Sequence, residues 1–296
     1  VTTLTNTGSV DGALDGIYNS GLFTTLTNSG TIGGTATTDG IWNAASGTIR
    51  TLTNASGGTI RGVDAGLANA GSIASLANSG TITGSANGIV NSGAITAFSN
   101  SGTVGGSSTT YAIWNKSSGT VASVSNSGTI TGSAYGLYNT AGTVTTLTNT
   151  GTIRGGTAGI YNSGTISTLI NAQGGGAGAA LTFAGSLPTN YVEQVISAAQ
   201  YGQLAYTGTD RTLTSFSLTS DSTLALGTYA NVLTGVTAVD GTVKGVFSNF
   251  RWMLSNTSGT NWDLIIARLG PDAANSLRAL GFSRDQRSEE HTSELQ

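Results

Sequence analysis

Apolar and small polar residues alternate in short runs along the first 176 residues, and glycine-rich turns separate the runs. Residues 26–28 (Leu-Thr-Asn) and 31–32 (Thr-Ile) form one copy of this pattern, around the turn Ser29-Gly30. An alternation with a period of two is typical of β-strands. We expect glycine to supply the positive φ angles of the tight corners. No helical apolar stripe occurs in this region, so the pattern predicts short strands only.

One asparagine recurs at the end of nearly every run, and its spacing sets the repeat. These residues are Asn6, Asn19, Asn28, Asn43, Asn54, Asn69, Asn78, Asn91, Asn100, Asn115, Asn126, Asn139, Asn149, Asn162 and Asn171. Every second asparagine, from Asn6 to Asn171, is 22 to 26 residues from the last. A fixed period in this range is typical of a solenoid. The predicted fold is all-β, a right-handed parallel β-helix of about seven coils with three short strands per coil.

Stacked coils place the same repeat position on one line. Asparagine amides on such a line can hydrogen-bond from coil to coil, and asparagine tolerates the left-handed conformation that we expect at the corners. A second line is apolar and is predicted to fill the core. Its residues are Ile17, Ile41, Leu67, Ile89, Ile113, Leu137 and Ile160.

The sequence pattern changes after the repeats, and we divide the chain into four predicted segments. Residues 1–182 form the solenoid, 183–269 a β-rich C-terminal cap, 270–286 the start of a helix, and 287–296 a tail. Residues 191–200 fit either a helix or a strand. The strands expected in the cap are 212–219, 229–236, 242–249, 251–254 and 262–267. Six apolar residues of this region are expected to cover the open end of the solenoid: Trp252, Met253, Leu254, Trp262, Leu264 and Ile266.

Three short sequence stretches of the cap resemble the passenger end of bacterial autotransporters, the proteins of type V secretion. They are residues 201–204 (Tyr-Gly-Gln-Leu), 227–236 (Gly-Thr-Tyr through Gly-Val) and 259–265 (Gly-Thr-Asn-Trp-Asp-Leu-Ile). The pertactin-like members of this family have a β-helical passenger that ends in an autochaperone junction, and the resemblance implies the same arrangement here. It also implies a linker helix from residue 270, an outer-membrane β-barrel as the passenger's own partner, and a location at the bacterial surface, in the outer membrane or outside the cell.

Both ends of the sequence suggest a fragment. The chain starts inside a repeat without an initiating methionine, and its last ten residues share nothing with the rest. Residues 287–296 hold the single histidine, His291, and resemble a translated sequencing adapter. We therefore expect an artefact at 287–296 and missing sequence on both sides.

Composition limits the chemistry that the chain can perform. Charged residues make up 8% of it and the net charge is −3, so the sequence shows no basic surface for nucleic acid. There is no cysteine, which excludes thiolate chemistry. The solenoid has no histidine or glutamate, so no Ser-His-Asp triad can form in it. Asp15 and Asp39 occupy equivalent positions on adjacent coils, either as an acid or calcium-binding pair or as two solvated turn residues. We predict no catalysis, metal or cofactor.

One column of the repeat is largely aromatic. It contains Tyr18, Trp42, Trp114, Tyr138 and Tyr161, and it is interrupted by Ala68 and Val90. The period-two rule points these side chains outward, where aligned rings can stack on a glycan or form a partner surface. Because the column faces no charge in sequence, we expect binding to be insensitive to salt. The alternative is that the rings only shield the strand or pack under loops.

These observations favour a surface-exposed or secreted autotransporter passenger that acts as an adhesin or a stalk, with a host or environmental glycan or protein as its partner. Two alternatives remain open. The chain is part of an enzyme, a glycan lyase, hydrolase or protease, whose catalytic part lies upstream of residue 1, or it is a purely structural spacer.

Overall fold

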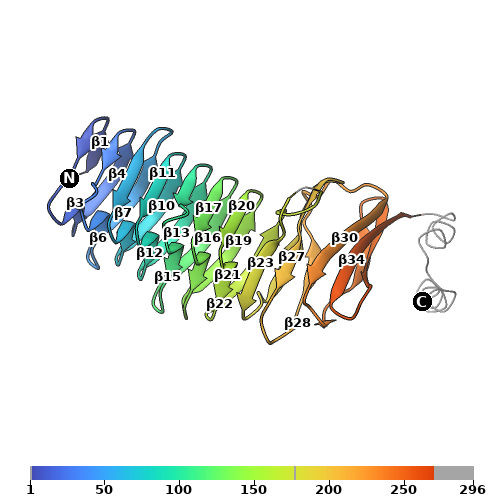
Figure 1. Ribbon diagram of the computed structural model, residues 1–296. Coiled ribbons are helices and arrows are strands. Elements are labelled where there is room, and N and C mark those ends of the chain that lie inside the picture. The colour runs from blue at the N-terminus through green and yellow to red at the C-terminus, as the bar shows by residue number, and fades with distance from the viewer. Residues whose placement is uncertain (1, 177, 270–296) are drawn as a thin grey trace.

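The computed structural model describes residues 2–176 and 178–269, and this part of the chain is entirely β-structure. Strands stack one behind another along a single axis, so that the molecule is a rod (Figure 1). The expected helix at 270–286 and the tail at 287–296 lie outside the described residues. Among the described residues, no helix is long and apolar enough to cross a membrane.

Each repeat forms one coil of three strands, and each strand pairs in parallel with its counterpart in the next coil. The first coil consists of β1 (Thr3–Asn6), β2 (Ser9–Val10) and β3 (Asp15–Asn19). Three parallel sheets therefore run along the rod. This arrangement confirms the predicted all-β solenoid of stacked coils.

The first sheet has ten strands. After β1 they are β4 (Leu22–Asn28), β7 (Thr48–Asn54), β10 (Ser72–Asn78), β13 (Ala94–Asn100), β16 (Thr120–Asn126), β19 (Thr143–Asn149), β22 (Thr165–Asn171), β24 (Asn190–Glu193) and β29 (Phe216–Leu218). The second sheet has seven. After β2 they are β5 (Thr31–Ile32), β8 (Thr59–Gly62), β11 (Thr81–Gly84), β14 (Thr103–Gly105), β17 (Thr129–Gly132) and β20 (Thr152–Gly155).

The third sheet has thirteen strands and runs the whole length of the rod. After β3 they are β6 (Asp39–Asn43), β9 (Ala65–Asn69), β12 (Asn87–Asn91), β15 (Tyr111–Asn115), β18 (Tyr135–Asn139), β21 (Ala158–Asn162), β23 (Leu181–Gly185), β27 (Leu204–Tyr206), β30 (Gly227–Thr234), β34 (Asn261–Arg268), β33 (Phe250–Asn256) and β32 (Lys244–Phe247). Two short pairs complete the fold: β25 (Val195–Ser197) with β26 (Gln200–Tyr201), and β28 (Thr212–Leu213) with β31 (Ala238–Val239).

The rod has about ten turns, so the predicted number of seven is too low. Parallel stacking continues past the last repeat asparagine, through β24 and β29 in the first sheet and through β23, β27 and β30 in the third. These later strands still bury apolar residues but lack the asparagine by which the coils were counted. The ambiguous segment 191–200 is strand and not helix: it includes β25 and overlaps β24 and β26.

The second sheet ends at β20 because a side chain takes the place of its next strand. Gln173 accepts a hydrogen bond from the Ile153 backbone N–H at 2.7 Å and donates one to the Ile153 carbonyl at 3.2 Å. Its amide thus pairs with β20 as a peptide group of another strand would. This satisfies buried backbone groups that would otherwise be left without partners.

The C-terminal end of the rod is an antiparallel sheet in which the last strand in sequence, β34, lies beside the first, β30. β30 pairs with β34, β34 with β33, and β33 with β32. Of the six apolar residues expected to cover this end, four are buried, namely Trp252, Leu254, Leu264 and Ile266, whereas Met253 and Trp262 are half-buried.

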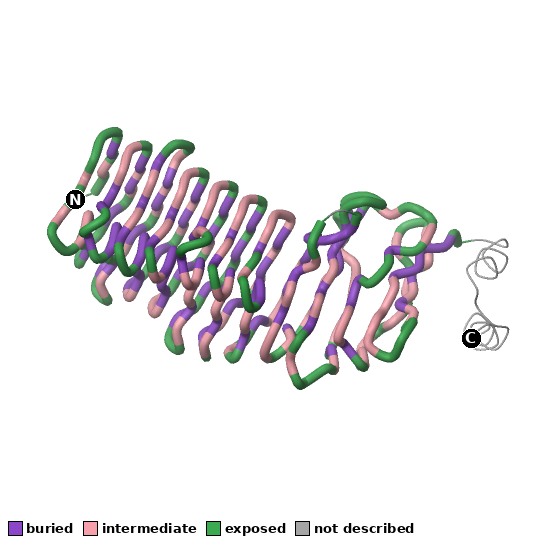
Figure 2. The backbone as a smooth tube through the Cα atoms, in the orientation of Figure 1, coloured by how far each residue is buried: buried purple, intermediate pink, exposed green. Residues whose placement is uncertain are grey.

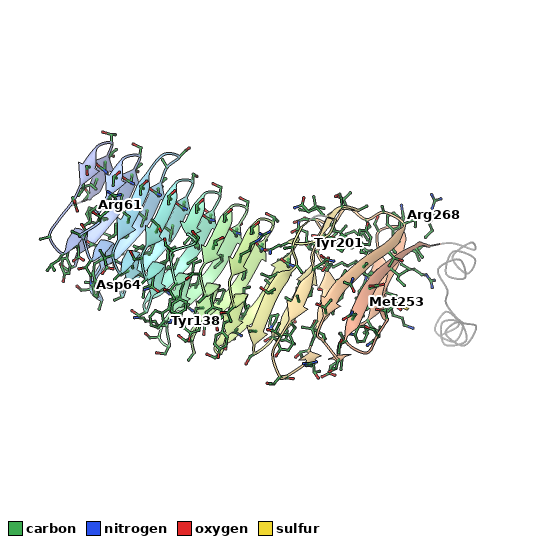
Figure 3. All side chains as sticks on the ribbon, viewed as in Figure 1. Arg61, Asp64, Tyr138, Tyr201, Met253 and Arg268 are labelled. Atoms are coloured by element: carbon green, nitrogen blue, oxygen red, sulfur yellow. The ribbon has the colours of Figure 1, made fainter. Side chains whose placement is uncertain are left out.

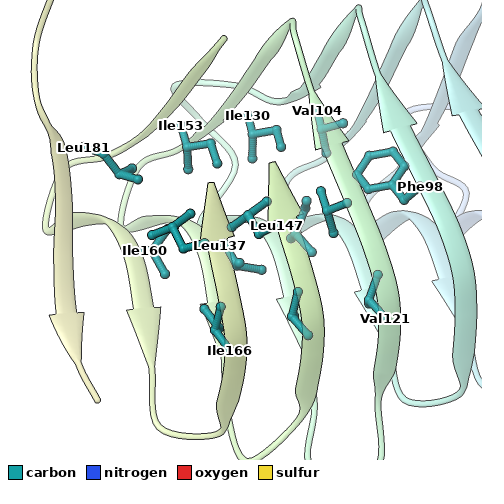
Figure 4. Close-up of a cluster of buried hydrophobic side chains, with 14 of the residues drawn as sticks. Phe98, Val104, Val121, Ile130, Leu137, Leu147, Ile153, Ile160, Ile166 and Leu181 are labelled. Carbon is teal, nitrogen blue, oxygen red and sulfur yellow. The ribbon is translucent and has the colours of Figure 1, made fainter. Parts of the chain in front are cut away.

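The interior of the solenoid is a continuous apolar core. Figure 2 shows buried segments recurring on successive coils along the rod. The predicted column from Ile17 to Ile160 is buried throughout, and each member is at most 8% exposed. Two further columns from the first sheet and one from the second complete the core, as the close-up in Figure 4 shows around Phe98, Ile130 and Leu147. Removing this apolar surface from water is the main source of stability.

All fifteen repeat asparagines are buried, and they form two hydrogen-bonded ladders. One ladder runs from Asn6 to Asn171 and the other from Asn19 to Asn162, with amide-to-amide distances between 2.6 and 3.2 Å. The predicted ladder is confirmed, but the predicted left-handed conformation is wrong. The described non-glycine residues with positive φ are Ala141, Asn231 and Ser248, and none of them belongs to a ladder.

Most repeat glycines are required by close packing rather than by φ. Gly33, Gly57 and Gly105 do adopt left-handed φ angles near 80°. The glycines two residues after a ladder asparagine do not, yet a Cβ on Gly102 would collide with the carbonyl oxygen of Gly80 in the preceding coil. Glycine therefore lets the corners of adjacent coils approach at the spacing that the strands impose.

We expect Asn100→Ala to lower the free energy of unfolding by about 3 kcal/mol, because it removes a buried amide that bonds to both neighbouring coils. Asn100 accepts from Asn78 and donates to Asn126, both at 2.8 Å. Urea unfolding measures the change. The control is Ser99→Ala, at the adjacent exposed position. Equal effects of the two substitutions would contradict the structural role of the ladder.

We expect Val124→Leu to raise the free energy of unfolding by about 1 kcal/mol, the contribution of one buried methylene. A cavity in the core is lined by Val121, Val124 and larger neighbours, and Val124 lies in register between Phe98 and Leu147. The control is Val104→Leu, also fully buried but outside this cavity, which should destabilise by overpacking. A loss of stability for Val124→Leu as large as for Val104→Leu would contradict the prediction.

Candidate binding surface

The five predicted site residues lie on the outer face of the third sheet. Strand pairing places Tyr18 beside Trp42, Trp114 beside Tyr138, and Tyr138 beside Tyr161. Tyr18 is 62% exposed and Trp42 39%, whereas Trp114, Tyr138 and Tyr161 are half-buried. The rings point away from the core, as the alternation predicts. Whether they bind a ligand remains a prediction.

The rings form two separate groups. Ala68 and Val90 stand in register between Trp42 and Trp114, and with Ala65 they make a small apolar cluster apart from the main core. Tyr18 and Trp42 therefore lie near the N-terminal end of the rod, and Trp114, Tyr138 and Tyr161 lie further along it. The two groups provide different surfaces, the first more exposed and the second more closely packed.

Two further tyrosines join the second group, and the sequence analysis missed both. Tyr111 lies 4.4 Å from Tyr138 between ring centroids, and Tyr135 lies 5.0 Å from Tyr138 with an interplanar angle of 5°. Trp114 contacts Tyr111 at 5.6 Å and Tyr161 contacts Tyr138 at 5.3 Å. We call Tyr111, Trp114, Tyr135, Tyr138 and Tyr161 the five-ring cluster. Figure 3 shows the place of Tyr138 on the rod.

A local break in the alternation explains why Tyr111 and Tyr135 were missed. Strict alternation would put residues 111 and 114 on opposite faces of the strand. In β15 the two residues between them, Ala112 and Ile113, are both buried, and Gly136 and Leu137 are both buried in β18. The residues on either side of each buried pair consequently point outward together. The sequence did contain a signal for them: Tyr111 and Tyr135 each stand three positions before a residue of the aromatic column.

Lys116 adds a charge to this surface, so the expectation that the column faces no charge is wrong. Its Nζ lies 4.3 Å from the centroid of the Trp114 ring, a cation–π contact. The Trp114 indole Nε1–H donates to Thr140 Oγ1 at 2.8 Å, which fixes the orientation of the ring. Lys116 follows the ladder residue Asn115, and its sequence position alone does not reveal that it reaches the ring.

The central ring of the cluster, Tyr138, keeps its phenol proton at neutral pH. Burial raises the pKa of the Tyr138 hydroxyl above its ordinary value, and its neighbours Tyr111, Tyr161 and Tyr135 raise it further. The surface thus combines partly exposed rings with one ammonium group. Such a surface can stack on apolar faces of a ligand and attract an anion.

A group of carboxylates lies nearer the N-terminal end of the same side of the rod, where Figure 3 labels Asp64. Asp15 and Asp39 are register partners, as predicted from the repeat. Asp39 is 1% exposed and accepts a hydrogen bond from the Ala65 N–H at 3.1 Å, and Asp64 accepts one from Asn87. Among the described residues, no group of three or more His, Cys, Asp or Glu side chains could hold a metal ion.

Burial is the main reason for the unusual titration of these carboxyls. Desolvation, followed by the charge of Asp64, raises the pKa of Asp39 from 3.8 to about 6. Asp15 contributes in the same direction, whereas the Ala65 hydrogen bond and the Lys116 charge oppose the shift. Burial also raises the pKa of Asp15. Charged Asp39 is therefore a cost to the folded state at neutral pH.

No protein-family model matches the chain, and no curated protein or solved structure matches it either. The class that the structure itself defines is a β-solenoid with a partly exposed aromatic surface.

We expect stability to fall as the pH rises from about 4 to about 6, because the folded state retains the Asp39 proton over this range and the unfolded chain releases it. Asp39→Asn keeps the acceptor for Ala65 and removes the charge. It should raise the free energy of unfolding at pH 7 by roughly 2 kcal/mol and flatten the pH dependence. Urea midpoints between pH 4 and 8 measure both effects.

The matched control is Asp210→Asn at an exposed position, which should leave the pH profile as it is in the unsubstituted chain. An Asp39→Asn profile that is as steep as the original would contradict the assignment.

Proposed function

We propose that this chain is part of a surface-exposed or secreted autotransporter passenger that serves as an adhesin, with the five-ring cluster as its contact surface. The observation that carries the proposal is the cluster itself. Five aromatic side chains gather on the face of three adjacent strands, and every one is partly exposed. Large apolar groups left at a surface in this way are typical of interaction sites.

The shape of the molecule supports a passenger. A rod of about ten turns, closed at one end by antiparallel strands, would hold a binding surface away from a point of attachment. The same architecture is implied by the resemblance of residues 201–204, 227–236 and 259–265 to autotransporter passenger ends. The partner in this proposal is a glycan or protein on a host cell or in the environment.

The chemistry of the repeats supports adhesion over catalysis. Between Asp64 and Glu193 the sequence contains no Asp, Glu or His. The aromatic surface therefore lies on coils whose sequence offers no carboxyl or imidazole group, the most common general acids and bases. Such a surface suits reversible binding.

The test compares the unsubstituted chain with Trp114→Ser/Tyr138→Ser on fluorescent beads. We expect the unsubstituted beads to adhere to cultured epithelial cells or to spots of a glycan array, and the double variant to lose adhesion by about tenfold or more, because two stacking rings are removed. β-rich circular dichroism must persist in both proteins.

The matched control is Tyr18→Ser/Trp42→Ser, which removes two rings outside the cluster and should retain adhesion. Beads that fail to adhere anywhere would favour the structural spacer, and adhesion that survives in Trp114→Ser/Tyr138→Ser would remove the cluster from the proposal.

A further inference from the structure

The charges of the solenoid are segregated along its length. Its four aspartates lie within residues 11–64, in the first three coils. The next carboxylate in the sequence is Glu193, and the charged residues between are Lys116 and Arg154. The five-ring cluster occupies residues 111–161 and thus falls wholly within the segment that has cations and no acid. An anion approaching the cluster meets no repulsion from neighbouring carboxylates on these coils.

Lys116 is the cation at the cluster, and it lacks an acidic partner. Within residues 2–176 and 178–269, Lys116 forms no ion pair, and its ammonium group lies over the Trp114 ring. The Lys116 charge has the smallest of the five effects on the pKa of Asp39, and Asp39 is 1% exposed. Lys116 itself is half-exposed. Its ammonium is therefore available to a carboxylate from outside the chain.

The strands beneath the cluster determine what kind of ligand fits. β15 pairs with β12 and β18, and β18 pairs with β15 and β21, so both edges of each strand are already occupied. An extended peptide binds most readily by adding to a free edge, which these strands do not offer. A ligand can instead lie on the exposed parts of the rings, where the flat C–H faces of sugar rings can stack.

We propose that the five-ring cluster and Lys116 together bind a saccharide that carries a carboxylate, such as a uronic or sialic acid. The sugar rings stack on the partly exposed tyrosines and Trp114, and the carboxylate accepts a charge-assisted hydrogen bond from Lys116 Nζ. This inference rests on the proposed adhesive function and adds the class of ligand. It replaces the salt-insensitive binding expected from the sequence with binding that weakens as ionic strength rises.

The test uses two pairs of probes that differ in charge: trigalacturonate with its methyl ester, and sialyllactose with lactose. Titration of the full chain is followed by calorimetry and by tryptophan fluorescence. We expect the acidic member of at least one pair to bind about tenfold or more tightly than the neutral member, the effect of one hydrogen bond to a charged group. Added salt should reduce this preference.

Two variants separate the role of Lys116 from a general effect of charge. Lys116→Gln keeps most of the side-chain stem and should abolish the preference for the acidic probe. Arg154→Gln removes the other cation of the segment from β20, in a different sheet, and should leave the preference unchanged.

Three results would overturn the inference: equal binding within both pairs, no binding of any of the four probes, or a preference that survives in Lys116→Gln. If bead adhesion is nevertheless lost in Trp114→Ser/Tyr138→Ser, the adhesive function stands and only the class of ligand fails. If the cluster variant adheres normally, the proposed function fails as well.

Discussion

The hydrogen bonds between stacked asparagine amides are the constraint on which the rest of the structure depends. Each amide inside a ladder donates to the asparagine of the next coil and accepts from that of the previous one. A shift of one coil by one residue would leave these groups without partners in a low-dielectric interior, at a cost of several kcal/mol. The same shift would turn the apolar residues outward. The ladders and the core therefore enforce a single register.

The ends of the ladders coincide with the transition to the cap. After Asn171 the register position is taken by Glu193, which is fully buried and accepts a hydrogen bond from the Tyr191 hydroxyl at 3.2 Å. Burial raises the pKa of Glu193 well above its ordinary value, so the carboxyl is favoured in its neutral form. After Asn162 the position is taken by Gly185. Gln173 closes the second sheet in the same region.

Fixed register has a consequence for the surface. Once every coil is aligned, any repeat position becomes a line along the rod, and a few substitutions on that line create a local surface without altering the fold. One such position carries Trp114, Tyr138 and Tyr161 in β15, β18 and β21, and these rings pack on one another and on Tyr111 and Tyr135. The scarcity of carboxylates on the same coils leaves Lys116 as the charge that a ligand meets.

The sequence by itself determined the solenoid, the strand type, the asparagine ladders and the outward direction of Tyr18, Trp42, Trp114, Tyr138 and Tyr161, because periodicity alone dictates which positions stack and which alternate. Only the tertiary structure decided the number of coils, since stacking in the cap is held by backbone pairing and apolar packing that leave no repeated residue. The tertiary structure also brought Tyr111, Tyr135 and Lys116 to the rings. The pairs of consecutive buried residues in β15 and β18 turn the two tyrosines outward, and the path of the Lys116 side chain brings its ammonium to Trp114. Both depend on the local shape of each corner, which the repeat pattern does not encode.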